Sequence, residues 1–261
     1  MTPLIKEIRQ IAEKTAAYQM KEFRKFPTGY GSEKDQKEYV SEIDVNSEEI
    51  IKEGLSRLLP EAGFFGEESG RTGSRETYWI VDPLDGTTNY LSGIDHFSVS
   101  IALYTENSLK AGLVLKSSTN DAYYAEKGHG AFHNDKKLKP IETMKPSSSL
   151  ICTGFPYRSP DLRQNFYQCC DQVLSFSRGL RRTGSAALDI AMLAAGYFQG
   201  FWESDLQAYD AAAALAILEE NGGKWSSTNH GEYTLGETRL FVAGWDETFT
   251  RLHDAVTECY S

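Results

Sequence analysis

Residues 79–89 read Trp-Ile-Val-Asp-Pro-Leu-Asp-Gly-Thr-Thr-Asn, and this stretch decides what fold and what chemistry we expect. Its apolar start predicts a short buried strand, after which Asp82 and Asp85 follow in close succession. Gly86 lets backbone N–H groups approach a ligand closely, and Thr87–Thr88 offer hydroxyls and can open a helix. Carboxylates followed by N–H groups at a helix start predict a site that holds a divalent cation beside a phosphate.

A capped turn with incidental acids is the alternative interpretation of the same stretch, and it would usually be correct for a lone Asp-x-x-Asp. An EF-hand loop is excluded because the Asp-x-Asp-x-Asp-Gly ladder of ligands is absent. The polar and glycine positions that follow in order after a buried strand favour the ligand site.

Further acids stand in two other segments. Glu67 belongs to Gly66-Glu67-Glu68-Ser69, and Asp210 opens an otherwise apolar helix. Read alone, Glu67 is a solvated loop charge and Asp210 an ordinary helix N-cap. Together with residues 79–89 they supply acids from three places, which is enough for two hard cations with oxygen ligands.

Composition and charge narrow the function classes. Of 261 residues, 40% are hydrophobic, which is enough for a substantial core. Asp and Glu number 37 against 27 Lys and Arg, a net charge of −10 that disfavours nucleic acid, and the only basic cluster is short, at 178–182. No apolar run reaches the roughly 18 residues of a membrane span, and the charged N-terminus is unlike a signal peptide. The four cysteines lack metal or disulfide spacing, so we expect a cytoplasmic protein.

The hydrophobic pattern predicts alternating helices and strands, with no internal repeat. We expect helices over 4–26, 44–60, 185–197 and 209–221, and strands over 78–82, 96–104, 110–115, 122–126, 200–203 and 240–244. The expected fold class is therefore α/β, with helices layered on sheets and the first sheet antiparallel. A polar stretch near 140–150 divides the chain into halves, 1–145 with most of the candidate cation ligands and 146–261 with the pocket and the last acid.

Several motifs together resemble the inositol monophosphatase family. They are residues 67–69, 79–89 and 210–212 with 219–223, joined by 154–158 and 181–187, and the resemblance runs nearly end to end. It implies an αβαβα sandwich of helix and sheet layers, a lithium-sensitive and Mg²⁺-dependent phosphatase, and a homodimer. Two departures stand out: Tyr209 replaces the usual Trp before the last acid, and Ser41 stands where Thr is common. Both keep the aromatic or hydroxyl character, so we expect tuning of the site.

The resemblance also implies a cation centre of two Mg²⁺ ions and a weaker third that shares Glu67. Its ligands are Glu67, Asp82 and the Leu84 carbonyl for the first ion, and Asp82, Asp85 and Asp210 for the second.

For catalysis, the resemblance implies that Asp44 and Thr87 orient the attacking water, while Gly86 and Thr87 offer backbone N–H groups to the phosphate. The pocket for the alcohol part is implied at Gly184, Ser185, Ala186 and Glu203.

The expected function is hydrolysis of a small phosphate monoester, inositol monophosphate first. No Ser–His–Asp or Cys–His arrangement is evident, which suits a reaction in which water attacks without a nucleophilic side chain. Fructose-1,6-bisphosphatase and 3′-phosphoadenosine-phosphate phosphatase activities remain open, since they share the acids and differ in the pocket. A non-catalytic regulator on the same fold is the alternative from another class.

Overall fold

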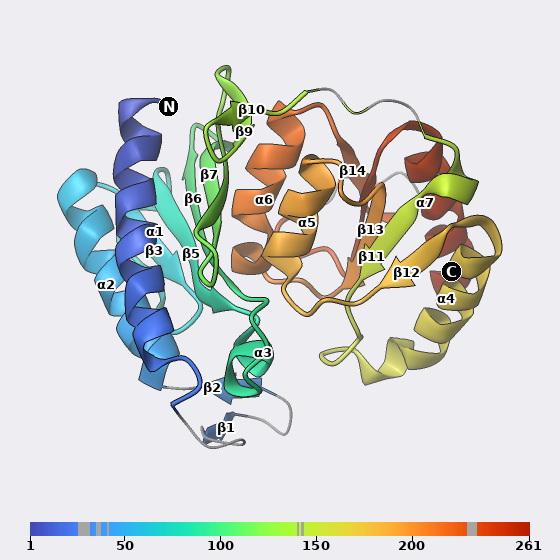
Figure 1. Cartoon of the computed structure of the whole chain (residues 1–261), viewed down its shortest axis with the longest axis horizontal. Helices are drawn as coiled ribbons and strands as arrows, with labels where there is room; N and C mark the ends of the chain where they lie inside the picture. The colour runs from blue at the N-terminus through green and yellow to red at the C-terminus, as the bar shows by residue number, and fades with distance from the viewer. Residues whose placement is uncertain (26–31, 35–37, 41, 140, 142–143, 229–233) are drawn as a thin grey trace.

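The computed structural model describes the chain apart from residues 26–31, 35–37, 41, 140, 142–143 and 229–233. Helix and sheet layers alternate across it in the order helix, sheet, helix, sheet, helix (Figure 1). This confirms the layered αβαβα prediction. In the described part, no helix is long and apolar enough to cross a membrane.

The larger sheet is eight-stranded and is built from the first half of the chain. Its strands, in spatial order, are β10 (Lys136–Lys137), β9 (Gly130–His133), β8 (Asp121–Glu126), β7 (Ser108–Lys116), β6 (Ser98–Thr105), β5 (Tyr78–Asp85), β3 (Gly63–Gly66) and β4 (Gly70–Thr72). Neighbours are antiparallel except for β3 and β5, which run parallel. Every residue of β5 is buried, because helices cover both faces, so its sequence reads as a continuous apolar run until Asp82.

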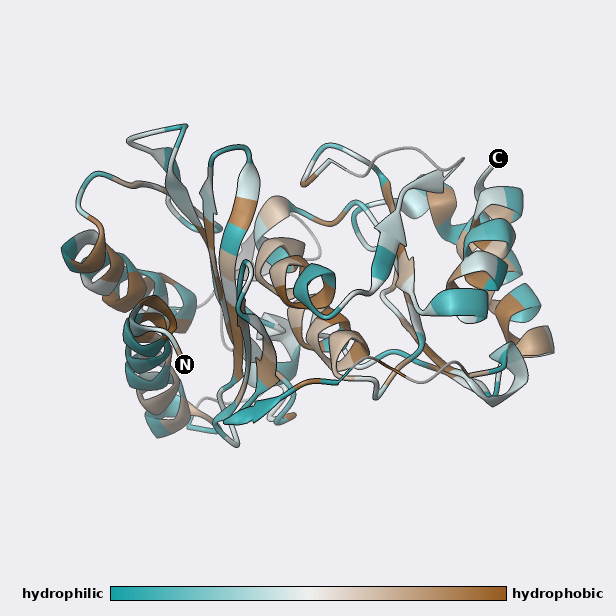
Figure 2. Cartoon of the chain, turned by 90° about the horizontal axis from the view of Figure 1, so that it is seen from above, coloured by the Kyte–Doolittle hydropathy of each residue, from teal (hydrophilic) through white to brown (hydrophobic). Residues whose placement is uncertain are grey.

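Helices cover the two faces of this sheet. The outer face carries α1 (Pro3–Glu22) and α2 (Glu42–Leu58), whose buried residues recur at helical spacing. The inner face carries α6 (Ala208–Glu220), against which α5 (Ala186–Ala194) packs. Figure 2 shows this middle pair largely in the colours of apolar residues, as expected for helices enclosed between sheets.

The smaller sheet is five-stranded and lies beyond the middle helices. Its order is β12 (Gly179–Arg181), β11 (Leu150–Thr153), β13 (Gly200–Ser204), β15 (Leu240–Gly244) and β14 (Lys224–Ser226). The outer layer on this side is α4 (Arg163–Phe176) with α7 (Asp246–Tyr260). Short elements complete the chain: β1 (Ser32–Lys34) paired with β2 (Glu38–Val40), α3 (Thr87–Leu91), η1 (Pro146–Ser148) and η2 (Pro160–Leu162).

Element boundaries differ from the expected ones in a few places. The first helix ends at Glu22 rather than at residue 26, and the helix expected over 185–197 ends at Ala194. The strand expected from residue 96 begins at Ser98. The larger elements that were not predicted are β11, α4 and α7, and several short strands, β3, β4, β9, β12 and β14 among them, were not predicted either. The first sheet is antiparallel as expected, apart from the β3–β5 pair.

The middle layer sits close to the larger sheet because both surfaces carry small residues. Residues 211–214 of α6 are all alanine and all buried. A Cβ at Gly112 of β7 would stand 2.2 Å from the Ala213 carbonyl oxygen and 2.8 Å from Ala216 Cβ. Glycine is therefore required there by close approach of the helix backbone.

We predict that Gly112→Ala lowers the free energy of unfolding by roughly 1–3 kcal/mol, because the added methyl group meets helix backbone that cannot move freely. Urea denaturation measures the loss. Gly179→Ala on β12 is the matched control, since its Cβ would meet only side-chain atoms at 3.6 Å or more. Equal stability of the two variants would contradict the close approach.

Candidate active site

The turn that follows β5 is shaped by Gly86. This residue has φ +97° and stands immediately before α3. A Cβ on Gly86 would lie 3.0 Å from the His96 carbonyl oxygen and 3.2 Å from that of Gly184. Both the backbone conformation and the space therefore demand glycine, and the turn is pressed against a loop from the second half of the chain.

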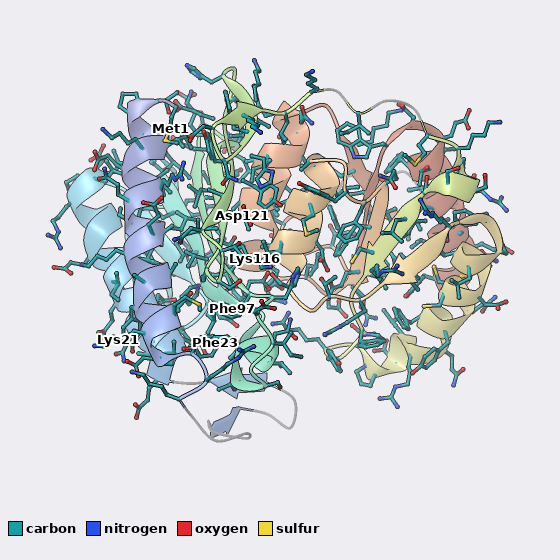
Figure 3. The ribbon with its side chains drawn as sticks, in the orientation of Figure 1. Met1, Lys21, Phe23, Phe97, Lys116 and Asp121 are labelled. Carbon is teal, nitrogen blue, oxygen red and sulfur yellow. The ribbon has the colours of Figure 1, made fainter. Side chains whose placement is uncertain are left out.

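Apolar and polar contacts, several of them from α1, hold this turn in place. Leu84 is buried in a cluster with Phe97, and Phe23 at the end of α1 packs on Phe97 with ring centroids 5.1 Å apart (Figure 3). Gln19 of α1 donates from Nε2 to the Pro83 carbonyl at 2.7 Å, and its Oε1 accepts from the Ser117 hydroxyl at 2.6 Å. The backbone that carries the candidate acids is thus fixed by α1 as well as by the sheet.

A cavity of about 540 Å³ opens at this turn. It is lined by every predicted site residue except Asp44: Glu67, Asp82, Leu84, Asp85, Gly86, Thr87, Gly184, Ser185, Ala186, Glu203 and Asp210. Asp44 lies just behind it, with Oδ1 3.4 Å from the Thr87 hydroxyl. The structure therefore brings all the predicted residues to one place, from both halves of the chain.

Two of the aspartates are oriented by hydrogen bonds to one carboxylate oxygen. The Leu84 N–H donates to Asp82 Oδ1 at 3.0 Å. Asp85 Oδ2 accepts from the Ser185 hydroxyl and from the Ala187 N–H, the latter at 2.8 Å. Among the described residues, no hydrogen bond to the second oxygen of either carboxylate is present. Each carboxylate is held firmly and keeps one oxygen for another partner.

Asp210 is the third residue of α6, so it is not the N-cap. Its Oδ2 accepts from the Gln207 N–H at 2.7 Å, which closes a capping box, and from Arg158 Nη1 at 3.0 Å. The capping role and a place in the cavity are compatible, because the helix end faces the cavity. Tyr209 packs edge-on against Phe65, and Ser41 lies outside the described residues.

Glu67 is positioned through a buried carboxylate that sequence reasoning missed. Glu48 of α2 is 3% exposed and accepts from the N–H groups of Glu68 and Ser69, each at 2.9 Å. A Cβ on Gly66 would stand 2.1 Å from Glu48 Oε2, so glycine is needed there. A usable signal did exist, because Glu48 follows Asp44 by one helical turn on the buried face of α2.

The acids strongly affect one another's pKa values. Burial, followed by the charges of neighbouring acids, holds the pKa of Glu67 and of Asp82 well above the usual range. Burial raises the pKa of Asp85 to about 7, partly offset by the hydrogen bond from Ser185. Negative charge at this place is therefore costly unless a cation balances it.

The donor set suits a hard cation. Carboxylate oxygens and the Leu84 carbonyl are the ligands that Mg²⁺ prefers, and no sulfur or imidazole lines the cavity in the described chain. With the side chains as placed, no three His, Cys, Asp or Glu of the described residues form a ready-made metal cage. The oriented carboxylates and their raised pKa values nevertheless fit a cation that would draw them together.

The second half of the chain supplies the opposite wall of the cavity. Burial raises the pKa of Glu203, on β13, well above its usual range. A Cβ at Gly154 would stand 1.9 Å from Glu203 Oε1, so the loop passes directly over this carboxyl. Asn89 ties the two walls together by donating to the carbonyls of His96 at 2.7 Å and Thr183 at 2.9 Å.

Several residues that line the cavity were not among the predicted site residues. They are Thr88, Thr153, Gly154, Phe155, Tyr157, Arg158, Arg182, Asp189, Ser204 and Leu206. Arg158 belongs to the segment 154–158, and Arg182 to the basic cluster 178–182 and the segment 181–187. Most of them lie in loops between helices and strands.

Comparison with known proteins gives a consistent picture. The chain matches the family model described as inositol monophosphatase family over residues 1–261. It is 40% identical over 223 residues to inositol-1-monophosphatase of Rhizobium meliloti, covering 84% of this chain and 83% of that one. It is 35% identical over 227 residues to Nus factor SuhB of Pseudomonas aeruginosa, covering 85% and 83%.

Solved structures are also similar. Extragenic suppressor protein suhB from Bartonella henselae superposes with a TM-score of 0.93 at 32% identity, covering 98% of this chain and 99% of that one. Inositol monophosphatase from Anabaena has a TM-score of 0.85 at 29% identity, covering 98% and 95%.

We predict that Glu48→Gln lowers the free energy of unfolding by about 2–3 kcal/mol, because an amide cannot accept from both N–H groups and turns its NH₂ toward one of them. Urea denaturation measures the loss, and faster hydrogen exchange at the Glu68 and Ser69 amides locates it. Glu49→Gln, exposed on the same helix, is the control and should change stability by less than about 0.5 kcal/mol. Unchanged exchange at the two amides would contradict this role.

Proposed function

The chain belongs to the inositol monophosphatase family, and from this premise we propose that it hydrolyses a small phosphate monoester, inositol monophosphate first, in a Mg²⁺-dependent reaction. The observation that carries the proposal is the single cavity in which acids from three segments face a pocket built by the other half of the chain.

Two cation positions account for the acids. Glu67, Asp82 and the Leu84 carbonyl would hold the first ion, and Asp82, Asp85 and Asp210 the second, with a weaker third sharing Glu67. Bound Mg²⁺ would offset the charge of the phosphoryl oxygens, lower the pKa of water and support the leaving alkoxide. Hydrogen bonds that already fix one oxygen of Asp82 and of Asp85 reduce the freedom that these ligands lose on binding.

Thr87 and Asp44 would orient the attacking water. The Thr87 hydroxyl has a single proton and two acceptors within reach, the Leu84 carbonyl at 3.0 Å and Asp44 Oδ1 at 3.4 Å. A cation held at the Leu84 carbonyl would compete for that oxygen and favour donation from Thr87 to Asp44. The Thr87 oxygen could then accept a hydrogen bond from the attacking water, and when it takes a proton from that water it would pass its own proton to the Asp44 carboxylate.

The phosphate and the alcohol part would occupy different walls. Backbone N–H groups of Gly86 and Thr87 stand beside the candidate acids and can donate to phosphate oxygens. Gly184, Ser185 and Ala186 leave room for a polyol ring, and Glu203 can accept from its hydroxyls or donate to them.

Two other phosphatase activities and a non-catalytic regulatory function are the alternatives to this proposal. Fructose-1,6-bisphosphatase or 3′-phosphoadenosine-phosphate phosphatase activity would use the same acids, and two arginines line the cavity. Relatives named Nus factor SuhB are 32–38% identical to this chain, which favours a non-catalytic regulator of a protein or RNA partner as the second candidate. A cytoplasmic location, a homodimer and lithium sensitivity are further proposals from the family resemblance.

We predict that phosphate release requires Mg²⁺ and stops in excess EDTA, because the acids need cations to balance their charge. From the family resemblance we also predict that excess Li⁺ inhibits it. Phosphate release from inositol 1-phosphate, fructose 1,6-bisphosphate and 3′-phosphoadenosine 5′-phosphate, with and without Mg²⁺, is the measurement. It also separates the candidate activities. Full turnover in EDTA would refute the cation proposal, and no release from any substrate with Mg²⁺ would favour the regulator.

Asp85→Asn and Thr87→Ala should separate cation binding from water positioning. In Asp85→Asn an uncharged amide turns its NH₂ toward the cation, so we expect activity to fall by at least about a hundredfold with weaker Mg²⁺ binding. In Thr87→Ala we expect kcat to fall by roughly 10²–10⁴ while Mg²⁺ affinity stays near wild type.

Calorimetric Mg²⁺ titration and circular dichroism give the readouts for this pair. Asp95→Asn, exposed and outside the cavity, is the control for a lost carboxylate. Near-normal turnover and affinity in Asp85→Asn would show that the second cation position is wrong. Loss of Mg²⁺ binding in Thr87→Ala would show that the division of roles is wrong.

A further inference from the structure

We propose that Arg158 is an internal counter-cation that competes with Mg²⁺ for Asp210, so that the protein gives up one ion pair each time the second cation position is filled. The contact keeps the crowded carboxylates balanced when Mg²⁺ is scarce, and it sets the Mg²⁺ concentration at which the site is loaded. This inference rests on the proposed function and concerns the regulation of the same site.

Arg158 reaches into the cavity from the loop between β11 and η2. Its Nη1 donates to Asp210 Oδ2 at 3.0 Å, and the contact is an ion pair as well as a charge-assisted hydrogen bond. The side chain of Asp210 is 9% exposed, whereas that of Arg158 is 37% exposed. The bond is therefore shielded from water on the side of the acid and open to water on the side of the arginine.

The charge of Arg158 acts on more than one acid of the cavity. It opposes the rise in the pKa of Glu67, although burial and the neighbouring acids outweigh it. The donors to Asp82 and Asp85 are by contrast neutral, namely backbone N–H groups and the Ser185 hydroxyl. Arg158 therefore supplies positive charge at the same group of acids that the proposed cations would balance.

A guanidinium and a divalent ion repel one another if both stay beside Asp210. Their repulsion is strong because this carboxylate is buried, where water screens charge poorly. A divalent ion held by Asp82, Asp85 and Asp210 is attracted by three carboxylates with twice the charge of a guanidinium held by one. At sufficient concentration Mg²⁺ therefore displaces Arg158 from Asp210.

Release of the arginine needs only rotation of its side chain, because the backbone that follows it is fixed. Ser159 is fully buried, and its hydroxyl shares a hydrogen bond with that of Ser204 at 3.3 Å. The partly exposed arginine side chain can turn into water. Asp210 keeps the Gln207 N–H as a donor at 2.7 Å after the guanidinium leaves, so the carboxylate stays oriented for a cation.

Calorimetric Mg²⁺ titration and thermal melting of Arg158→Ala test the competition without a measurement of activity. We expect the Kd for Mg²⁺ to fall by about three- to tenfold, the magnitude of one partly exposed ion pair that the cation no longer has to break. In EDTA the variant should melt below wild type, whereas in saturating Mg²⁺ the two should melt at the same temperature, because the loaded protein no longer contains the pair. Arg158→Lys keeps the charge and loses the planar fork, so its Kd should lie between the two.

Arg163→Ala is the matched control, since Arg163 is exposed at the start of α4 and does not line the cavity. Its Kd for Mg²⁺ and its two melting temperatures should equal those of wild type. Unchanged or weaker Mg²⁺ binding in Arg158→Ala with a native circular dichroism spectrum overturns the competition, and a lower melting temperature in saturating Mg²⁺ as well as in EDTA shows that the arginine orients Asp210 in the loaded protein instead. Absence of Mg²⁺ binding heat and of a Mg²⁺-dependent melting shift in wild type overturns the cation centre of the proposed function itself, so the two failures are distinguishable.

Discussion

The crowding of carboxylates at one buried place is the constraint on which the rest of the structure depends. Burial and mutual repulsion penalise the charged forms of Glu67, Asp82 and Asp85, so each acid needs donors aimed at it. The donors to Asp82 and Asp85 come from the β5 turn and from the start of α5, and the start of α6 supplies the donor to Asp210. The layered fold places three element ends at the same point, and Asn89 ties the two walls together there.

The features that could be predicted from the sequence are those determined by residues close together along the chain. Residues 79–89 combine a buried strand, a glycine turn and a short helix in one continuous segment, and the structure shows each of them. Ala-rich α6 was evident for the same reason, and the layered architecture was expected from the alternation of elements and from the family resemblance. The ligand and catalytic roles of the gathered residues, and the boundary near 140–150, stay predictions.

The features that were missed depend on partners far along the chain. Gln19 and Glu48 stand as polar exceptions on apolar helix faces, and only the fold reveals that they hold the Pro83 carbonyl and the amides beside Glu67. In the sequence, Arg182 is part of the basic cluster 178–182. Only the fold shows that its guanidinium stacks on the rings of Phe155 and Tyr157. The helix α7 has a narrow apolar stripe, Leu252, Val256 and Cys259, among many charges, and that spacing could have revealed it.

The helix that fills the inner face of the eight-stranded sheet is made long after the sheet itself. A ribosome that has completed β10 at Lys137 must still add the chain as far as Glu220 before α6 exists. At about 5–20 residues per second this takes several seconds, during which Ile80, Ala102 and Val114 have no cover. The nascent chain therefore exposes an apolar sheet face during this part of its synthesis, and exposed apolar surface of this kind is prone to aggregation until α6 covers it.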